Sequence, residues 1–390
     1  MGSLKDYLRN NVRQYAMLIA LVFIMLFFQV ATEGVLLVPM NVTNLVLQNA
    51  YVFILAIGMT LCILTGGNID LSVGSVVAFI GALCGTFAVT MKMGVGISIL
   101  FALLIGLAIG LWQGFWIAYV RLPAFIVTLA GMLTFRGLTV FMLKGLTIGP
   151  FPESFQQISS GFVPDLLGNE DSLFDVTTLV VGAIISVLFI LSQTVQRVNR
   201  RRRGYESTPF LLFVIKLILV VGVIALASFW LASYRGIPII FIIIGILVLA
   251  YSFFTLKTVP GRYLYATGGN EKAAQLSGID TNKVLFFAYV NMGVMAAVAG
   301  IAVASRLNAS SPLAGQNFEL DAIAACFIGG ASASGGIGTI VGAIIGALVM
   351  GVLNNGMSIM GIGSDIQQVV KGLVLLAAVA FDVLSKRKAR

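Results

Sequence analysis

The sequence predicts an all-α polytopic membrane protein with about 10–12 transmembrane helices, as its composition, the length of its apolar runs and the placement of its charges indicate. Of the 390 residues, 59% are hydrophobic and 10% are charged, and the mean hydropathy is +1.03. A soluble domain carries about 25% charged residues, so this chain could not cover a water-facing surface. No segment has the composition of a separate soluble domain, and we interpret residues 1–390 as a single transmembrane domain.

The apolar runs are long enough to cross a bilayer, which takes about 20 helical residues. The tenth run is too short to cross alone and is followed by glycines, which indicates a broken or tilted helix. The candidate spans are 17–37, 46–65, 71–91, 96–119, 124–144, 176–196, 210–231, 237–256, 284–305, 320–333, 337–357 and 366–384.

Lysine and arginine in the short loops set the orientation, because positive charge is retained on the cytoplasmic side. With the N-terminus inside, the inner segments hold most of the basic residues, including the run Arg200–Arg203. The longest outer segment, residues 145–175, carries acidic residues and no Lys or Arg. The sequence therefore predicts cytoplasmic N- and C-termini and an external loop at 145–175.

Several classes of function are excluded by what the chain lacks. Histidine is absent, and Cys62, Cys84 and Cys326 all lie in apolar runs, so we expect no metal site and no disulfide framework. No glycine-rich phosphate loop followed by Lys and Ser or Thr occurs, so the chain should hold no cofactor and should not hydrolyse ATP itself. The net charge of +9 could suggest a nucleic-acid binder, but the basic residues lie between apolar runs, where they orient a membrane protein. We expect no catalytic residue.

The break between the second and third spans is the first segment that could carry function. Gly66–Gly67 is expected to end one helix, and Asp70 or Ser72 can cap the next by accepting a hydrogen bond from its free amides. The segment is either a structural cap or a gate in a substrate path, and the sequence leaves both interpretations open.

The inner loop 257–283 is the longest inner loop and has a specific organisation. Pro260–Gly261 and Gly268–Gly269 are expected to turn the chain. Asn270 is a good cap for a short helix of about two turns, which Gly278 would end.

This short helix offers a surface to a partner. Ala273, Ala274 and Leu276 would form a small apolar knob, and a capped helix with an apolar tip suits docking into a groove. A plain connector is the alternative. The residues of this coupling segment are Gly268, Gly269, Asn270, Glu271, Lys272, Ala273, Ala274, Leu276, Ser277 and Gly278.

The segment 305–336 is a candidate wall of a pathway. Glu319 and Asp321 are expected to begin a helix that re-enters the membrane, because acidic residues favour a helix N-terminus. The glycine pairs Gly329–Gly330 and Gly335–Gly336 then interrupt it. Irregular backbone at membrane depth is tolerated where it is buried in protein or lines a cavity.

Polar residues within the spans complete the candidate set for a pathway or gate. Amides and hydroxyls can hydrogen-bond a polar solute, but they also join helices to one another, and both uses remain open. Arg136 is costly within a span and requires a partner or a watery cavity. The candidates are Asn49, Asp70, Ser72, Gln113, Thr128, Thr134, Arg136, Asn291, Asn354 and Asn355.

Four strings together resemble the permease subunits of bacterial monosaccharide ABC importers, the ribose, xylose and galactose group. The resemblance runs from about residue 20 to the C-terminus and is greatest to the longer xylose and multiple-sugar permeases. The strings are GNIDLSVGS at 67–75, PAFIVTLAGMLTFRG at 123–137, YATGGNEKAAQLSGI at 265–279 and LDAIAACFIGG at 320–330.

The resemblance implies a type II-like importer permease, a multi-pass protein of the bacterial plasma (inner) membrane. Such a permease works as a homodimer or with a sister permease, takes a monosaccharide from an extracytoplasmic sugar-binding protein and is driven by cytoplasmic ABC ATPase subunits. The stretch 268–279 corresponds to the coupling helix of the family. Residues 176–255 would be extra spans that shorter ribose-type permeases lack. The resemblance does not fix the sugar.

An ion-coupled secondary transporter of a small polar solute is the main alternative. It would require an essential carboxylate within the membrane and would take up solute without an ATPase partner. A membrane enzyme or structural protein is disfavoured because the chain lacks a catalytic set.

Overall fold

The computed structural model describes residues 12–168, 172–205 and 209–387. Within these ranges the regular secondary structure is helical, apart from two isolated β-bridges. The chain divides into two compact units. Unit 1 comprises residues 1–36, 45–160 and 240–390, and unit 2 comprises residues 37–44 and 161–239. Part of the basic charge used for the orientation lies at 1–11 and 388–390, outside the described residues.

The helices follow one another through short connections. Most of them belong to unit 1, whereas α8 and α9 belong to unit 2. Their bounds are α2 Val12–Ala31, η1 Val35–Leu37, α3 Pro39–Leu64, α4 Val73–Cys84, η2 Gly85–Thr90, α5 Val95–Ala118, α6 Ala124–Leu143, α7 Glu153–Ser160, α8 Val176–Arg202, α9 Phe210–Ala232, α10 Ile239–Lys257, α11 Val259–Gly269, α12 Glu271–Leu276, α13 Thr281–Leu307, α14 Phe318–Ile328, α15 Ile340–Ile359 and α16 Ser364–Arg387.

The predicted spans correspond to these helices. Among the described residues, ten helices are long and apolar enough to cross a membrane, and Met17–Ala31 of α2 is a shorter apolar stretch. The all-α polytopic fold is confirmed. Three boundaries differ by six residues or more: α2 ends at Ala31 instead of 37, α3 begins at Pro39 instead of 46, and α8 continues to Arg202 instead of 196. Hydropathy locates the apolar part of a helix, whereas its hydrogen-bonded turns can continue into polar sequence.

Glycines allow the central helices of unit 1 to approach closely. A Cβ on Gly293 of α13 would lie under 3.0 Å from the backbone of Gly106 and Gly110 on α5. Real Cβ atoms essentially never show such contacts. Gly106, Gly110 and Gly114 lie four residues apart on α5, a spacing that predicts close helix contact, and the packing of α5 against α13 confirms it.

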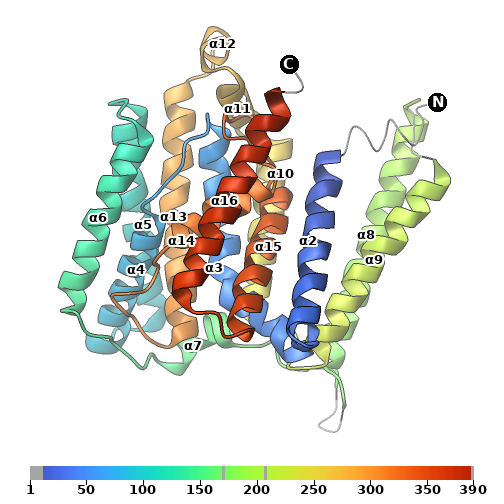
Figure 1. Ribbon diagram of the computed structural model, residues 1–390, viewed down its shortest axis with the longest axis horizontal. Coiled ribbons are helices and arrows are strands. Elements are labelled where there is room, and N and C mark those ends of the chain that lie inside the picture. The colour runs from blue at the N-terminus through green and yellow to red at the C-terminus, as the bar shows by residue number, and fades with distance from the viewer. Residues whose placement is uncertain (1–11, 169–171, 206–208, 388–390) are drawn as a thin grey trace. The chain divides into compact units, whose positions relative to one another are not determined.

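The two ends of unit 1 are distinct. Figure 1 shows α12 at the same end as the C-terminal part of α16, whereas α7 lies at the opposite end. The helix α14 has 11 residues, and residues 329–339 continue from it without helix to α15. The expected broken segment is therefore confirmed.

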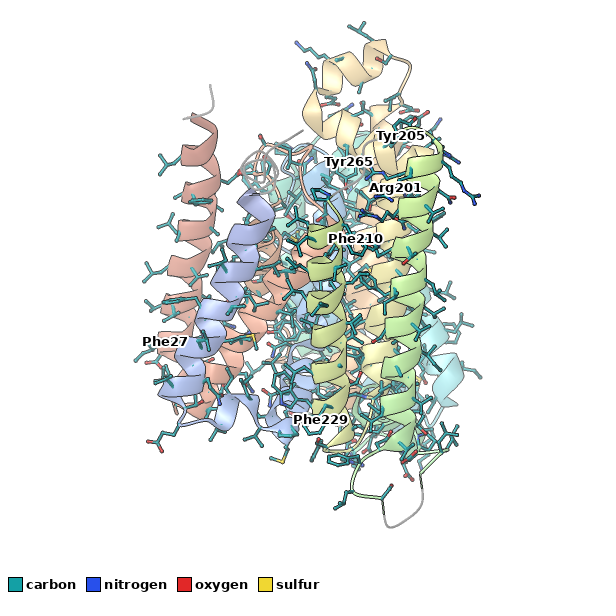
Figure 2. The ribbon with its side chains drawn as sticks, turned by 90° about the vertical axis from the view of Figure 1, so that its right-hand side faces the viewer. Phe27, Arg201, Tyr205, Phe210, Phe229 and Tyr265 are labelled. Carbon is teal, nitrogen blue, oxygen red and sulfur yellow. The ribbon has the colours of Figure 1, made fainter. Side chains whose placement is uncertain are left out.

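Unit 2 is built around the helix pair α8 and α9. The two helices pack side by side, with the labelled Phe210 and Phe229 near opposite ends of α9 (Figure 2). Lys216 of α9 donates to the side chain of Gln193 on α8 at 3.0 Å. This contact gives a polar partner to a lysine that the sequence places inside a span.

Candidate functional site

The loop between α10 and α13 is mostly helical. Thr258 precedes α11, and its hydroxyl accepts a hydrogen bond from the amide of Gly261 at 3.1 Å. Pro260 lies in the first turn, where an amide donor is not needed. The turn expected at Pro260–Gly261 is therefore wrong, because this pair lies in the first turn of α11, whereas Gly268–Gly269 ends α11 immediately before α12 begins.

The short helix α12 has the ends that the sequence predicts. The Asn270 side-chain oxygen accepts a hydrogen bond from the amide of Ala273 at 3.0 Å, which confirms the cap. Gly278 has a φ of +83°, and the next amide, that of Ile279, returns to the carbonyl of Ala274 at 3.0 Å. The expected end at Gly278 is also confirmed.

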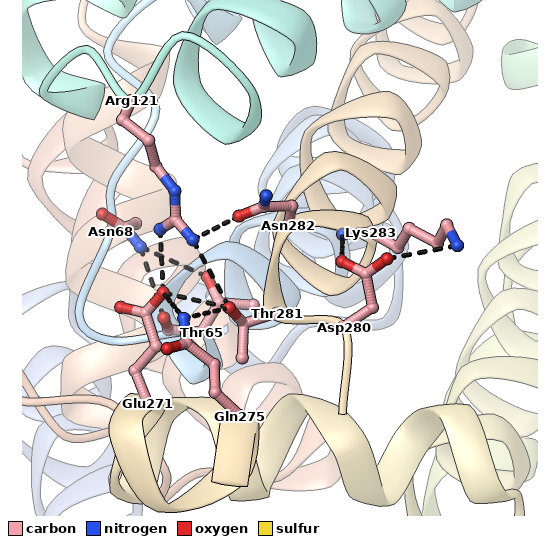
Figure 3. Close-up of polar contacts among 9 residues, drawn as sticks. All are labelled: Thr65, Asn68, Arg121, Glu271, Gln275, Asp280, Thr281, Asn282 and Lys283. Carbon is pink, nitrogen blue, oxygen red and sulfur yellow. Dashed lines mark hydrogen bonds and ion pairs between the residues drawn. The ribbon is translucent and has the colours of Figure 1, made fainter. Parts of the chain in front are cut away.

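A polar network joins α12 to the α5–α6 connection and to the start of α13 (Figure 3). Arg121 donates to Glu271 at 2.8 Å and also contacts Thr281 and Asn282. The hydrogen bond from Arg121 holds the pKa of Glu271 below its usual value, against the opposing effect of burial. Arg121 and Glu271 are both partly exposed, so the network positions α12 more than it stabilises the fold.

The exposed tip of α12 is narrower than the sequence suggests. Leu276 is 91% exposed, whereas Ala274 is only 4% exposed. Ala274 therefore does not contribute to the predicted apolar knob. The surface available to a partner consists of Leu276 with its exposed neighbours Lys272, Ala273 and Ser277.

Three glycine pairs meet where α11 ends, and we call this contact the glycine junction. It comprises Gly66–Gly67 after α3, Gly268–Gly269 at the end of α11 and Gly335–Gly336 between α14 and α15. A Cβ on Gly268 would lie under 3.0 Å from the carbonyl oxygen of Leu64 and from the amide of Gly336. The Gly336 amide also donates to the Leu64 carbonyl at 3.1 Å. Three backbone segments are thus in direct contact immediately beside α12.

Asp70, Ser72 and Gln113 form a buried chain of hydrogen bonds between the α3–α4 break and α5. The amide and hydroxyl of Ser72 donate to Asp70 at 2.8 and 2.6 Å, and Gln113 donates to the Ser72 hydroxyl at 2.8 Å. Ser72 is the residue before α4 but makes no side-chain cap bond, so the expected capping of first-turn amides is wrong. Burial raises the pKa of Asp70 to about 6. This chain joins the break to α5.

A cavity of about 330 Å³ lies among α3, α13, α14, α15 and α16 of unit 1. The α13 residues that line the cavity lie at the C-terminal end of this 27-residue helix, whereas α12 lies just before its N-terminal end. The length of α13 therefore separates the cavity from α12. Its lining also includes apolar groups such as Leu47, Val303 and Phe318. The polar lining side chains are Gln48, Asn49, Tyr51, Arg306, Asn354, Ser358, Gln367 and Lys371.

Two of the predicted pathway residues meet at this cavity. Asn49 on α3 is buried and donates to the carbonyl of Leu45 at 2.9 Å. Asn354 on α15 donates in turn to the side-chain oxygen of Asn49 at 3.2 Å. Residues 305 positions apart thus form one hydrogen-bonded pair in the cavity wall.

A buried ion pair adjoins the cavity. Lys371 on α16 lies 3.0 Å from the carboxylate of Asp321 on α14, and the Tyr51 hydroxyl donates to the same carboxylate at 2.6 Å. The side chains of Lys371 and Asp321 are only 15% and 1% exposed. The ring of Tyr51 stacks on that of Phe318 with 3.5 Å between centroids. The arrangement offers aromatic surface and hydrogen-bond donors side by side.

Comparison with known proteins identifies the family. Residues 41–379 match the family described as branched-chain amino acid transport system / permease component. The chain belongs to this family. It is 40% identical to the xylose transport system permease protein of Haemophilus influenzae over 97% of this chain and 98% of the relative.

Further relatives give the same result. The xylose transport system permease protein of Escherichia coli K12 is 39% identical over 97% of this chain and 93% of its own length. The ribose import permease protein of the same strain is 34% identical over 88% and 85%. No solved structure matches the chain significantly.

The chain is thus a non-catalytic permease subunit of an ABC importer and a multi-pass inner-membrane protein. Permeases of this class work with a partner ATPase that hydrolyses ATP and with a binding protein. The resemblance to permeases of monosaccharide ABC importers, which the four sequence strings carry, is confirmed.

The remaining candidate residues of the permease lie in separate places. Arg136 donates to the carbonyls of Pro312 and Ala314 at 3.0 and 2.7 Å, which supplies the partner that its place in a span requires. Asn291 accepts from the hydroxyl of Tyr251. Three further candidates also lie outside the cavity lining: Thr128, bonded to its own helix at Ala124, Thr134, exposed on α6, and Asn355, buried on α15.

The ion pair Asp321–Lys371 is the main feature of the site that the candidate set omits. Asp321 is expected at a helix N-terminus, and the structure confirms that place, but its partner lies 50 residues away on another helix. A lysine in an apolar span requires a counter-charge, and this signal points to an acidic residue at membrane depth.

Replacing Lys371 with Met is expected to destabilise the permease by about 3–5 kcal/mol, because it leaves the Asp321 carboxylate buried without its cation. The loss should appear as a lower melting temperature of the purified protein. The double variant Lys371→Met, Asp321→Asn removes both charges and should recover much of the loss. Equal melting temperatures for the single and double variants would show that the pairing does not matter.

Proposed function

We propose that the permease translocates a monosaccharide, xylose or a related pentose or hexose, in an ATP-driven importer. The observation that carries this is the 40% identity to a xylose transport permease over nearly the full length of both chains. The coverage includes residues 176–255, the extra spans expected relative to ribose-type permeases.

The cavity supports a sugar pathway. Its lining includes amides, hydroxyls and cations, which suit the hydroxyl groups of a monosaccharide. It also includes aromatic rings, which suit the C–H faces of the sugar. A branched aliphatic side chain, which the family description would suggest, requires a mainly apolar pocket. Contacts with the sugar can be weak, because the extracytoplasmic binding protein supplies the affinity.

The coupling segment supports an ATPase contact. On this proposal α12 lies on the cytoplasmic face and inserts Leu276 into a groove of the ATPase. ATP binding moves α12, and the Arg121–Glu271 network and the glycine junction carry the movement into the bundle. The permease itself uses no cofactor.

A second permease copy completes the proposed assembly, with the pathway continuing between the two copies. The loop 145–175 then faces the outside, where the sugar-binding protein docks. The helices α8 and α9 form most of the extra segment and carry many exposed apolar side chains, which suits a lipid or protein neighbour within the membrane.

An ion-coupled transporter is the second candidate, and one observation favours it. Asp321 is a buried carboxylate beside the cavity, which is the feature that ion coupling requires. Its pairing with Lys371 argues against free ion exchange.

Reconstitution in vesicles distinguishes these functions. The permease, with its co-purified ATPase and a saturated sugar-binding protein, should take up labelled xylose only when all three components and ATP are present. Dissipating proton and sodium gradients should not change the rate, and leucine should not compete. Uptake by the permease alone, driven by an ion gradient, would refute the proposal.

A further inference from the structure

We propose that each copy of the permease holds a sugar subsite within its own cavity, where the side-chain oxygen of Asn354 accepts a hydrogen bond from a sugar hydroxyl. This inference rests on the proposed function and deepens it, because it names the residue and the chemical group that meet. It also places the contact within one chain.

The direction of the hydrogen bonds in the cavity wall is fixed by a backbone carbonyl. The carbonyl of Leu45 can only accept, so Asn49 must direct its NH2 group toward Leu45 and its oxygen toward Asn354. Asn354 must therefore present its NH2 group to Asn49. Its own oxygen remains as the free end of the chain.

That free end is a buried acceptor without a protein partner. Among the described residues, no group donates to the Asn354 oxygen, and the oxygen is shielded from bulk solvent. A buried acceptor is costly when it is left unsatisfied, so the site requires a donor from outside the protein. Asn354 lines the cavity, and we expect its side chain to turn toward a bound ligand, whose hydroxyl then supplies that donor.

The other walls complete a site for a neutral polyhydroxyl compound. Tyr51 and Phe318 present stacked rings, and Arg306 lines the cavity without an ion pair among the described residues. Lys371 is already neutralised by Asp321, which lowers the attraction for an anion. A volume of about 330 Å³ lies at the lower end of the range of ligand pockets and accommodates a pentose or hexose.

The helix α3 links the subsite to the glycine junction, because it carries Asn49, the partner of Asn354, and ends at Leu64, whose carbonyl accepts from Gly336. Asn49 and Leu64 both belong to α3, 15 residues apart, which corresponds to about 22 Å along the helix axis. A movement of the α3 end at the junction therefore changes the position of Asn49, and through it that of Asn354.

Uptake of deoxy sugars tests the contact in the complete reconstituted importer. The wild type should transport xylose about tenfold faster than one of its monodeoxy analogues, as expected for the loss of one hydrogen bond. Asn354→Leu should lower xylose uptake by about tenfold and should remove the discrimination against that analogue. Asn354→Ser, which restores an acceptor, should recover part of the discrimination against that analogue. Unchanged discrimination in Asn354→Leu would overturn the subsite.

A labelling experiment keeps the test valid if Asn354→Leu folds poorly. Asn354→Cys introduces a cavity thiol, while the native Cys62, Cys84 and Cys326 are all buried. Xylose should slow its reaction with a small methanethiosulfonate reagent, and leucine should not. The absence of protection by saturating xylose, or protection by leucine, would overturn the subsite. A wild-type importer that transports no monosaccharide would instead overturn the proposed function.

Discussion

Replacing Gly268 with alanine is expected to abolish the accumulation of folded permease. The added Cβ would lie under 3.0 Å from the Leu64 carbonyl and the Gly336 amide, and both are backbone atoms that cannot rotate away. One of the three segments of the glycine junction must then move, at a cost of about 3 kcal/mol, the upper end of the usual range for overpacking. The yield of monodisperse protein and its melting temperature measure the effect.

Gly269 provides a matched control. It is the adjacent residue, it ends the same helix, and a Cβ there would meet no atom within 4 Å. Gly269→Ala should therefore behave like the wild type, and any gain in helix propensity is common to both substitutions. If both variants were equally stable, the close backbone contact at the junction would be refuted.

Replacing Leu276 with aspartate should weaken the binding of the ATPase to the permease while leaving the fold of the permease intact. Leu276 is 91% exposed, so the free chain loses no core contact. Burying a leucine side chain in a groove contributes about 1.5–3 kcal/mol, so docking should weaken by at least about tenfold, with a further cost for burying the new charge. Co-purification of the ATPase and ATP-driven sugar uptake should both fall.

Leu276→Met is the conservative control and should retain docking and uptake, because it keeps an apolar side chain of similar volume. The melting temperature of the free permease should be the same in both variants. Full uptake by Leu276→Asp would exclude α12 as the site of ATPase contact.

The sequence predicts the spans well because lipid imposes a physical rule on them. Each span must be apolar over about 20 residues, and positive charge orients the loops. The ends of α12 were equally predictable, because Asn270 and Gly278 act through local backbone bonds. The sequence does not predict α11, because Pro260–Gly261 is typical of a turn, yet the cap at Thr258 makes this pair the start of a helix.

The cavity could be predicted only in part. Asn49 and Asn354 are both polar residues within predicted spans, but nothing in the sequence pairs residues that lie 305 positions apart. Asp321 and Lys371 were each visible as charges near apolar runs, and their contact depends on how α14 packs against α16. Such pairs depend on tertiary packing, which cannot be derived from the local pattern of a single sequence.

The continuity of α3 has a consequence for how far the importer must move. Its 26 residues extend for about 39 Å, with the cavity wall at Asn49 and the glycine junction beyond Leu64. Such a helix acts as a lever arm: tilting the stretch from Leu64 to Asn49 by about 10° would displace one end by about 4 Å, since that stretch is about 22 Å long. A shift of that size exceeds the length of a hydrogen bond, so a modest rotation is enough to break and remake contacts with a bound sugar.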